Sequence, residues 1–145
     1  MSNNRVETHA AHQFVVQIDG ISSAAFTECT LPSLEVEVEE EKEGGYNEGV
    51  HLLPGRVLRG TLTLKRGIST DQALIKWYNE VLQGQLGKAL RQVSVILYSL
   101  EGQPVARWDF KNAYPTKWSS PTLKTGESEL ALESLELAYE SVAVT

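Results

Sequence analysis

The clearest pattern along the chain is an alternation of apolar and polar residues that recurs in short segments. It is sharpest where Leu34, Val36 and Val38 alternate with three glutamates. A period of two places successive side chains on opposite faces of a strand, so one face is aliphatic and the other carries carboxylates. Similar segments lie at residues 13–18, 58–65, 93–98, 105–110 and 130–139. Many strands without regular strand–helix alternation favour a mainly β protein, either an antiparallel sandwich or a barrel-like sheet.

A single segment, at about residues 70–83, has the spacing of an amphipathic helix. Asp71 suits the positive end of the helix dipole, and Gly84 supplies a left-handed stop. The apolar residues that fall on one stripe are Leu74, Trp77, Tyr78, Val81 and Leu82. Aromatic residues at this spacing are typical of a core, so we expect one helix that flanks the sheet.

Regular alternation stops between about residues 43 and 56. This segment holds three glycines and, besides them, a Pro-Gly pair, which predicts a long loop. Loops of this length are uncommon inside compact domains and are often functional. Because the segment also carries Tyr46, Leu52 and Leu53, we expect it to pack against another surface.

Two later segments also break the alternation. Residues 112–121 contain Pro115, Pro121 and Trp118, and we expect them to be irregular. Near Glu133 the apolar phase shifts by one residue. Such a shift indicates a β-bulge or a strand that is covered on both faces.

Length and composition predict a single domain that spans residues 1–145. Apolar residues make up 41% of the chain, which is too many for general disorder. Residues 1–12 are polar and are expected to form a flexible arm that lacks the apolar segment of a secretory signal. No stretch is long and apolar enough to cross a membrane, and the net charge of −6 argues against tight binding to nucleic acid.

The sequence contains no constellation that predicts catalysis. His9 and His12 lie in the polar arm without an acidic or cysteine partner, and His51 has no other histidine near it in sequence. Cys29 is the single cysteine and is typical of a small buried apolar residue. The chain has neither a phosphate-binding loop nor a Gly-x-Ser-x-Gly elbow. We therefore expect no catalytic residue, no cofactor and no metal, and the unexplained aromatic residues favour a structural or interaction protein.

A series of short motifs follows in a fixed order along residues 13–140. They are Phe14-x-Val16-x-Ile18-Asp19-Gly20-Ile21, Phe26-x-Glu28-Cys29, Glu43-Gly44-Gly45-x-Asn47, Leu53-Pro54-Gly55-Arg56, Leu62-Thr63-Leu64-Lys65-Arg66-Gly67, Trp77, Arg107-Trp108, Ala113-x-Pro115-x-Lys117-Trp118 and Glu133-Ser134-Leu135-Glu136-Leu137. Together they resemble the tail tube proteins of contractile injection machines. That group comprises contractile-tailed phages, tailocins and phage-tail-like extracellular injection systems, with the type VI secretion tube as a more distant relative. The sequence departs from the group at Leu31-Pro32, where many relatives carry a serine-glycine pair before the leucine.

The resemblance implies an antiparallel β-sandwich or barrel-like tail-tube fold with the helix at 70–83 on its flank. It also implies six-fold rings of this chain that stack into a hollow tube. The long loop at 43–56 would reach the neighbouring ring. Its expected ring-stacking residues are Gly44, Gly45, Tyr46, Asn47, Leu53, Pro54, Gly55 and Arg56. Such a tube performs no bond chemistry and acts as a conduit that is driven through a target envelope when the surrounding sheath shortens.

The resemblance further implies a set of partners and a location. The partners are further copies of the chain, a contractile sheath protein, baseplate or spike proteins and tube-terminating proteins. Cargo in the lumen would be a toxin protein or DNA. Assembly is expected in the bacterial cytoplasm, within a phage tail or a phage-tail-like particle, and without membrane insertion by this chain.

Two rows of glutamates are candidates for the wall of the lumen. They are Glu35, Glu37 and Glu39, and Glu129, Glu133 and Glu136. A row of carboxylates would keep the lumen hydrated and would weakly repel anionic cargo. The alternative is that these carboxylates form ion pairs between subunits, with the partners Arg56, Arg59, Lys65 and Arg66.

Two other functions stay open at this point. A baseplate protein that initiates the tube would share the fold but would form only one or two rings. A free-standing β-sandwich that binds a peptide or a carbohydrate would stay monomeric at micromolar concentration and would need an exposed aromatic platform.

Overall fold

The computed structural model describes residues 13–21, 26–42, 50–68, 71–120 and 131–145. For residues 39–42 and 50–58 it describes the backbone but not the side chains. The strands are β1 (Gln13–Ile18), β2 (Glu28–Thr30), β3 (Glu35–Lys42), β4 (Val50–Leu58), β5 (Leu62–Gly67), β6 (Arg91–Tyr98), β7 (Pro104–Ser119), β8 (Leu132–Ala138) and β9 (Ser141–Val144). The helices are α1 (Ala73–Leu82) and the single-turn α2 (Leu86–Ala89).

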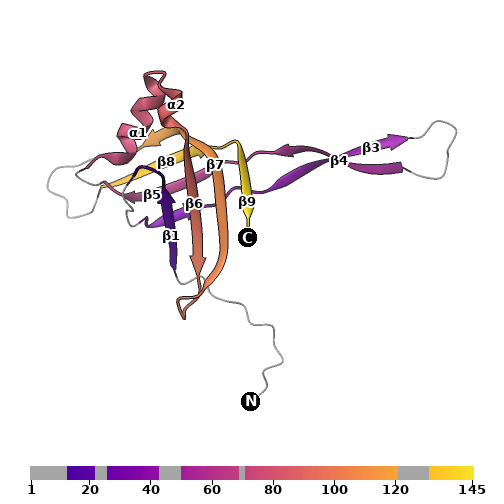
Figure 1. Ribbon diagram of the computed structural model, residues 1–145, viewed down its shortest axis with the longest axis horizontal. Coiled ribbons are helices and arrows are strands. Elements are labelled where there is room, and N and C mark those ends of the chain that lie inside the picture. Colours follow the sequence, from indigo (N-terminus) through magenta and orange to yellow (C-terminus); the bar gives the residue numbers. More distant parts are fainter. Residues whose placement is uncertain (1–12, 22–25, 43–49, 69–70, 121–130) are drawn as a thin grey trace, which may run out of the picture.

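All of the strand pairs in these residues are antiparallel. Seven strands form one sheet in the order β1-β6-β7-β8-β5-β2, with β9 also paired to β7, and β3 and β4 form a separate hairpin. Since β1 and β2 stand at opposite ends of this order, the sheet is not closed into a barrel. Figure 1 shows the β3–β4 hairpin reaching far out from the other strands. The prediction of a mainly antiparallel β protein is confirmed.

Strand β7 joins the two halves of the sheet. Its first part pairs with β6 and β9, and its second part, from Tyr114 onward, pairs with β8. Between them Asn112 adopts a left-handed backbone conformation (φ 51°), and its side-chain amide donates to Glu140 Oε2 at 2.6 Å. A register shift between Pro115 and Lys117 follows. The expectation that residues 112–121 are irregular is therefore wrong for 112–119, because a turned backbone and a bulge accommodate the proline inside a strand.

The hydrophobic core lies between the two halves of the sheet, with α1 packed beside it. Val16, Val93 and Phe110 come from one half of the sheet and Leu64 and Leu135 from the other, and all five are buried. Alternation along each strand supplies these inward positions. The helix α1 contributes two more buried side chains, those of Leu74 and Trp77.

The predicted helix is present, but its span and the burial of one of its apolar residues differ from the prediction. The predicted span of 70–83 shortens to α1, whose first turn is held by a hydrogen bond from the Ala73 backbone N–H to Asp71 Oδ1 at 3.0 Å. Val81 packs against the core, but Leu82 is 66% exposed. The apolar residues of α1 therefore lie on more than one face of the helix.

The prediction of a loop at 43–56 is wrong for residues 50–56. Residues 50–56 belong to strand β4, which pairs with β3 from Lys42↔Val50 to Glu35↔Leu58. The sequence does not predict this strand, because Pro54 and Gly55 are both unfavourable inside a regular sheet. They lie at a register shift in the hairpin, between the pairs Val36↔Val57 and Val38↔Pro54. Residues 43–49 lie outside the described part of the chain.

Strand β8 has no bulge at the predicted place. Its register with β5 is continuous from Leu62↔Leu137 to Gly67↔Leu132. The apolar phase is broken because Glu133 occupies an inward position of the same phase as Leu135. A charged residue inside the protein, and not an extra residue in the strand, therefore explains the shift.

Candidate assembly surfaces

The aliphatic face of β3 and of the residue before it is uncovered. Leu34 and Val36 are each 51% exposed, and Val38 is 65% exposed. Fully burying an aliphatic side chain stabilises by about 1.5–3 kcal/mol, so much of this stabilisation is not realised in the single chain. Isolated exposed apolar residues are common, but a row of three on one strand is typical of an interaction surface.

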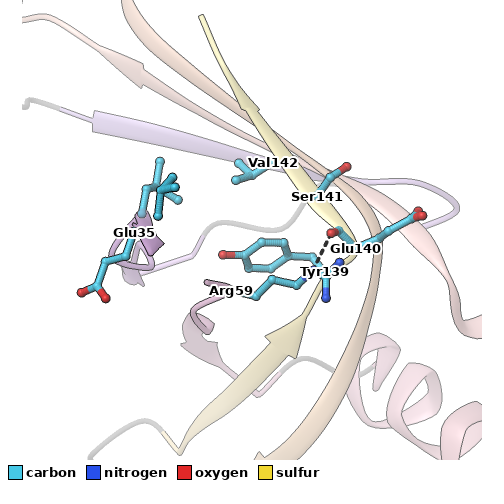
Figure 2. A pocket seen from close by; sticks show the side chains of 8 residues that line it. Glu35, Arg59, Tyr139, Glu140, Ser141 and Val142 are labelled. Atoms are coloured by element: carbon cyan, nitrogen blue, oxygen red, sulfur yellow. Dashed lines mark hydrogen bonds between the residues drawn. The ribbon is translucent and has the colours of Figure 1, made fainter. Parts of the chain in front are cut away.

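A groove of about 470 Å³ lies where this face meets the C-terminal strands. Leu34, Val36, Tyr139 and Val142 give it apolar walls. Figure 2 shows Tyr139 and Arg59 lying side by side in it, with a hydrogen bond from Arg59 to Glu140. Glu35, Ser141 and the two residues of this bond complete the lining. The groove is apolar inside and charged at its edge, as in many protein contacts.

The backbone near the groove is tightly fixed. The Gly60 N–H donates to the Tyr139 hydroxyl oxygen at 3.1 Å, and Arg59 Nε donates to the Glu140 carbonyl oxygen at 2.7 Å. A Cβ at position 60 would lie 2.6 Å from the Cβ of Pro32, so only glycine permits this close approach. The base of the β3–β4 hairpin is therefore held firmly against the turn between β8 and β9.

The expected ring-stacking residues fall in two groups. Leu53, Pro54, Gly55 and Arg56 lie in β4, where Leu53 pairs with Glu39 of β3 and Pro54 with Val38. Gly44, Gly45, Tyr46 and Asn47 lie outside the described residues. The hairpin thus carries the first group away from the core, and its contacts stay a prediction.

The candidate glutamates of the lumen do not form two equivalent rows. Glu35 is exposed and Glu37 is half-buried, while Glu39 is described by its backbone alone and Glu129 lies outside the described residues. Glu136 is half-buried, and its carboxylate lies 3.6 Å from Lys117 Nζ. Glu133 is only 2% exposed. The prediction that Glu133 lines a lumen is therefore wrong, since its side chain points into the core of its own subunit.

Glu133 is one partner in a buried charged cluster. Arg66 Nε donates to Glu133 Oε2 at 3.1 Å, and the Trp118 indole N–H donates to Glu133 Oε1 at 2.7 Å. The Arg66 guanidinium also lies 5.7 Å from the centre of the Phe26 ring and 3.7 Å from Asp71 Oδ1. Both charged side chains are 2% exposed. The alternative in which Arg66 pairs with one of these carboxylates between subunits is therefore wrong for Glu133, because the two side chains pair within one subunit.

Sequence reasoning missed this cluster, although the sequence carries a signal for it. Arg66 shares the phase of Leu62 and Leu64 along β5, and Glu133 shares the phase of Leu135 along β8. Two opposite charges at inward positions of strands are a pattern that a buried ion pair explains.

Strands β6 and β7 carry a polar network of Ser94, Arg107 and Asp109. Ser94 Oγ donates to Asp109 Oδ1 at 2.6 Å, and Arg107 Nε donates to the same oxygen at 3.0 Å. The hydrogen bond from Ser94, together with the contacts to Arg107, lowers the pKa of the Asp109 carboxyl below its ordinary value. These three polar side chains are therefore paired within the chain, and Val105, two residues before Arg107 on β7, is 44% exposed beside them.

No reaction centre stands out in the described ranges. Among the residues placed there, no group of three or more histidine, cysteine, aspartate or glutamate side chains could hold a metal ion. Cys29 packs against the core, and burial raises the pKa of its thiol to about 11, so the thiol stays protonated near neutral pH. None of the described helices is long and apolar enough to cross a membrane. His9 and His12 lie outside the described residues, and the side chain of His51 is not described.

An open antiparallel sheet with the helices α1 and α2 on its flank and a projecting β3–β4 hairpin is a fold of the tail-tube type. The model of the T4-like virus tail tube protein gp19 family matches residues 10–143. The chain belongs to this tail tube family, and the resemblance found in the sequence is confirmed.

Solved structures support the same fold. A chain of the anti-feeding prophage baseplate is 25% identical, with 97% of both chains covered and a TM-score of 0.74. A chain of the sheath-tube complex of the extracellular contractile injection system PVC is 20% identical, with 95% of this chain and 91% of that chain covered and a TM-score of 0.77. A chain of the anti-feeding prophage tube-terminating cap is 19% identical, with 100% and 95% covered and a TM-score of 0.76. No curated protein matches the chain.

Proposed function

We propose that this chain is the structural subunit of the inner tube of a contractile injection machine. Copies form hexameric rings, and the rings stack around a lumen through which cargo is delivered. The proposal rests on the uncovered aliphatic face of Leu34, Val36 and Val38. In a protein that stayed monomeric this face would remain in contact with water, whereas assembly would bury it. The chain performs no bond chemistry in this role.

The proposed partners are those of such a machine. They are other copies of the chain, a contractile sheath protein, baseplate or spike proteins and tube-terminating proteins. Similarity to chains of a sheath-tube complex, a baseplate and a terminating cap supports this set. We propose that the tube is assembled in the bacterial cytoplasm and holds a toxin protein or DNA as cargo.

We keep the lumen proposal for Glu35, Glu37 and Glu39, while Glu129, which lies outside the described residues, and half-buried Glu136 stay predictions. If a second copy covers the aliphatic face of β3, the alternation of the strand puts exposed Glu35 and half-buried Glu37 on the opposite face, and Glu39 follows in the same phase of the sequence. We propose that they line the lumen and keep it hydrated. An electron cryomicroscopy map that placed them on the sheath-facing wall would contradict this role.

The assembly role is tested by Val36→Asp. Val36 is half exposed, so the chain should fold normally, but a carboxylate in a packed contact lacks a partner. We expect the variant to sediment as a monomer at concentrations where the unmodified protein forms rings or tubes. Val36→Ile keeps the apolar surface and is the matched control. A strictly monomeric unmodified protein, even when concentrated, would refute the proposed function.

Ring stacking by the hairpin has its own test. Leu53→Asp should cost several kcal/mol per copy if Leu53 packs against the next ring. We expect rings or monomers, but no long tubes, in negative-stain images. Long tubes of normal appearance would show that another part of the chain stacks the rings.

A terminal or initiating ring on the same fold is the second candidate function. Similarity to a baseplate chain and to a tube-terminating cap favours it. A bulk tube subunit is present in many copies per particle, whereas an initiator or a cap forms one or two rings. Quantitative mass spectrometry of purified particles separates these two functions.

A further inference from the structure

The helix α1 carries a second apolar stripe that the core does not use. Leu74 and Trp77 point inward, whereas Ile75, Tyr78 and Leu82 follow one another at intervals of three and four residues on another face. Ile75 is 37% exposed and Leu82 is 66% exposed. The exposed stripe has the spacing of a surface that contacts another protein.

This stripe forms one wall of a groove of about 440 Å³. Trp118 of β7 also lines the groove, and its indole N–H is fixed by the hydrogen bond to buried Glu133. Lys76 also lines it and is the sole charged residue among the described lining residues. We call this feature the α1 groove. Its walls are apolar, the Trp118 ring on one wall is fixed by its hydrogen bond, and Lys76 places a positive charge at one side.

The turn between β6 and β7 presents a complementary feature. Leu100 is 60% exposed at its tip, and Glu101 follows it. The turn is closed by hydrogen bonds from the Ser99 N–H to the Gln103 carbonyl oxygen at 2.9 Å and from the Gly102 N–H to the Ser99 carbonyl oxygen at 3.0 Å. A short, fixed turn therefore holds an apolar side chain beside a carboxylate.

The two features lie at opposite ends of β6. The helices α1 and α2 precede the first residue of β6, and the turn follows its last residue. Strand β6 has 8 residues, and at about 3.3 Å per residue this places the features about 25 Å apart. Figure 1 shows the helices at one end of the long β6 and β7 strands and the turn at the other. The features cannot meet within one copy, but they can meet between two copies.

We propose that Leu100 of one copy inserts into the α1 groove of the next copy, with Glu101 facing Lys76. This contact rests on the proposed self-assembly. It would be a second surface through which copies meet, besides the β3–β4 hairpin. It is heterologous, joining two different patches head to tail, as rings and stacked tubes require. A contact of α1 with α1 would instead be two-fold symmetric and would bring Lys76 close to another Lys76.

Cross-linking between two single variants tests the geometry. Leu82→Cys and Leu100→Cys are prepared separately, mixed during assembly and treated with oxidised glutathione. We expect disulfide-linked dimers in the mixture and none with either variant alone, since the protonated thiol of Cys29 reacts slowly. Dimers of Leu82→Cys alone would overturn the proposal in favour of an α1–α1 contact. Assembled tubes without any cross-link in the mixture would also overturn it, while leaving the proposed tube function intact.

Charge reversal tests the polar part of the same contact. Lys76→Glu and Glu101→Lys each place like charges together, and we expect each to raise the concentration needed for assembly by about tenfold. The double variant Lys76→Glu/Glu101→Lys should return close to the unmodified value. Lys88→Glu, a charge reversal on α2 outside the α1 groove, is the control for net charge. Additive losses in the double variant would overturn the pairing, even if tubes still form.

Discussion

Replacing Glu133 with alanine should lower the free energy of unfolding by about 3–5 kcal/mol, because it leaves the buried Arg66 guanidinium without its carboxylate. Within the described part of the chain, Arg66 Nη1 and Nη2 are buried and donate no hydrogen bond. The other carboxylate near them is that of Asp71, which is largely exposed and lies 3.7 Å from Nη2. The Trp118 indole N–H would also lose its acceptor. Urea denaturation of the unassembled subunit, followed by tryptophan fluorescence, measures this loss.

Two further variants separate charge from packing at the same place. Glu133→Gln keeps an acceptor for Trp118 but removes the charge, so its loss should be smaller than that of Glu133→Ala. The double variant Arg66→Met/Glu133→Leu replaces the ion pair by apolar groups and should be close to the unmodified protein in stability. A loss below about 1 kcal/mol for Glu133→Ala would contradict a structural role of the pair, since this is the range of exposed ion pairs.

Replacing Trp77 with alanine should also destabilise the subunit by about 3–5 kcal/mol, the usual cost of removing a large buried aromatic side chain. Trp77 is 1% exposed, and its indole N–H donates to the Ala89 carbonyl oxygen at 2.6 Å, which ties α1 to α2. Arg91 lies over its ring at 5.8 Å and pairs with Glu80 at 2.9 Å. The loss is measured by urea denaturation, with Tyr78→Ala as a half-buried aromatic control on the same helix.

The variant Trp77→Phe separates the contribution of apolar packing from that of the indole hydrogen bond. It keeps most of the apolar volume but leaves the Ala89 carbonyl without its donor, so a loss of about 1–3 kcal/mol is expected. If Trp77→Ala and Tyr78→Ala cost the same, the indole would not be the anchor of α1 on the core.

Strands with one covered face could be predicted well from the sequence. In β1, Val16 and Ile18 are buried and Gln17 is exposed, as their alternation predicts. The helix was equally clear, since Leu74 and Trp77 recur at helical spacing. In these elements the local pattern and the burial in the fold agree, so no long-range information is needed.

Other features depend on contacts between distant residues, which a local pattern does not report. The alternation at 34–39 is the sharpest in the chain, yet its aliphatic face is uncovered, because periodicity says which residues share a face but not what covers it. Arg66 and Glu133 pair across 67 positions of sequence. Each alone suggests an exposed residue, since charged side chains are rarely buried without a partner.

The prolines misled the prediction in a similar way. Pro54 and Pro115 both lie within strands, each beside a register shift with the neighbouring strand. A proline removes a backbone donor, and a bulge is one of the few places in a sheet where that donor is not needed. Composition alone therefore predicted loops where the fold has bent strands.

The continuous course of β7 through both halves of the sheet has a mechanical consequence. A load applied to β6 reaches β8 along the covalent backbone of one strand, without relying on side-chain contacts between separate layers. Pulling the halves apart along β7 would have to break its backbone hydrogen bonds to β6 and β9 on one side or to β8 on the other. Two unconnected sheets have no such shared ladder, and only their side-chain contacts would resist the same pull.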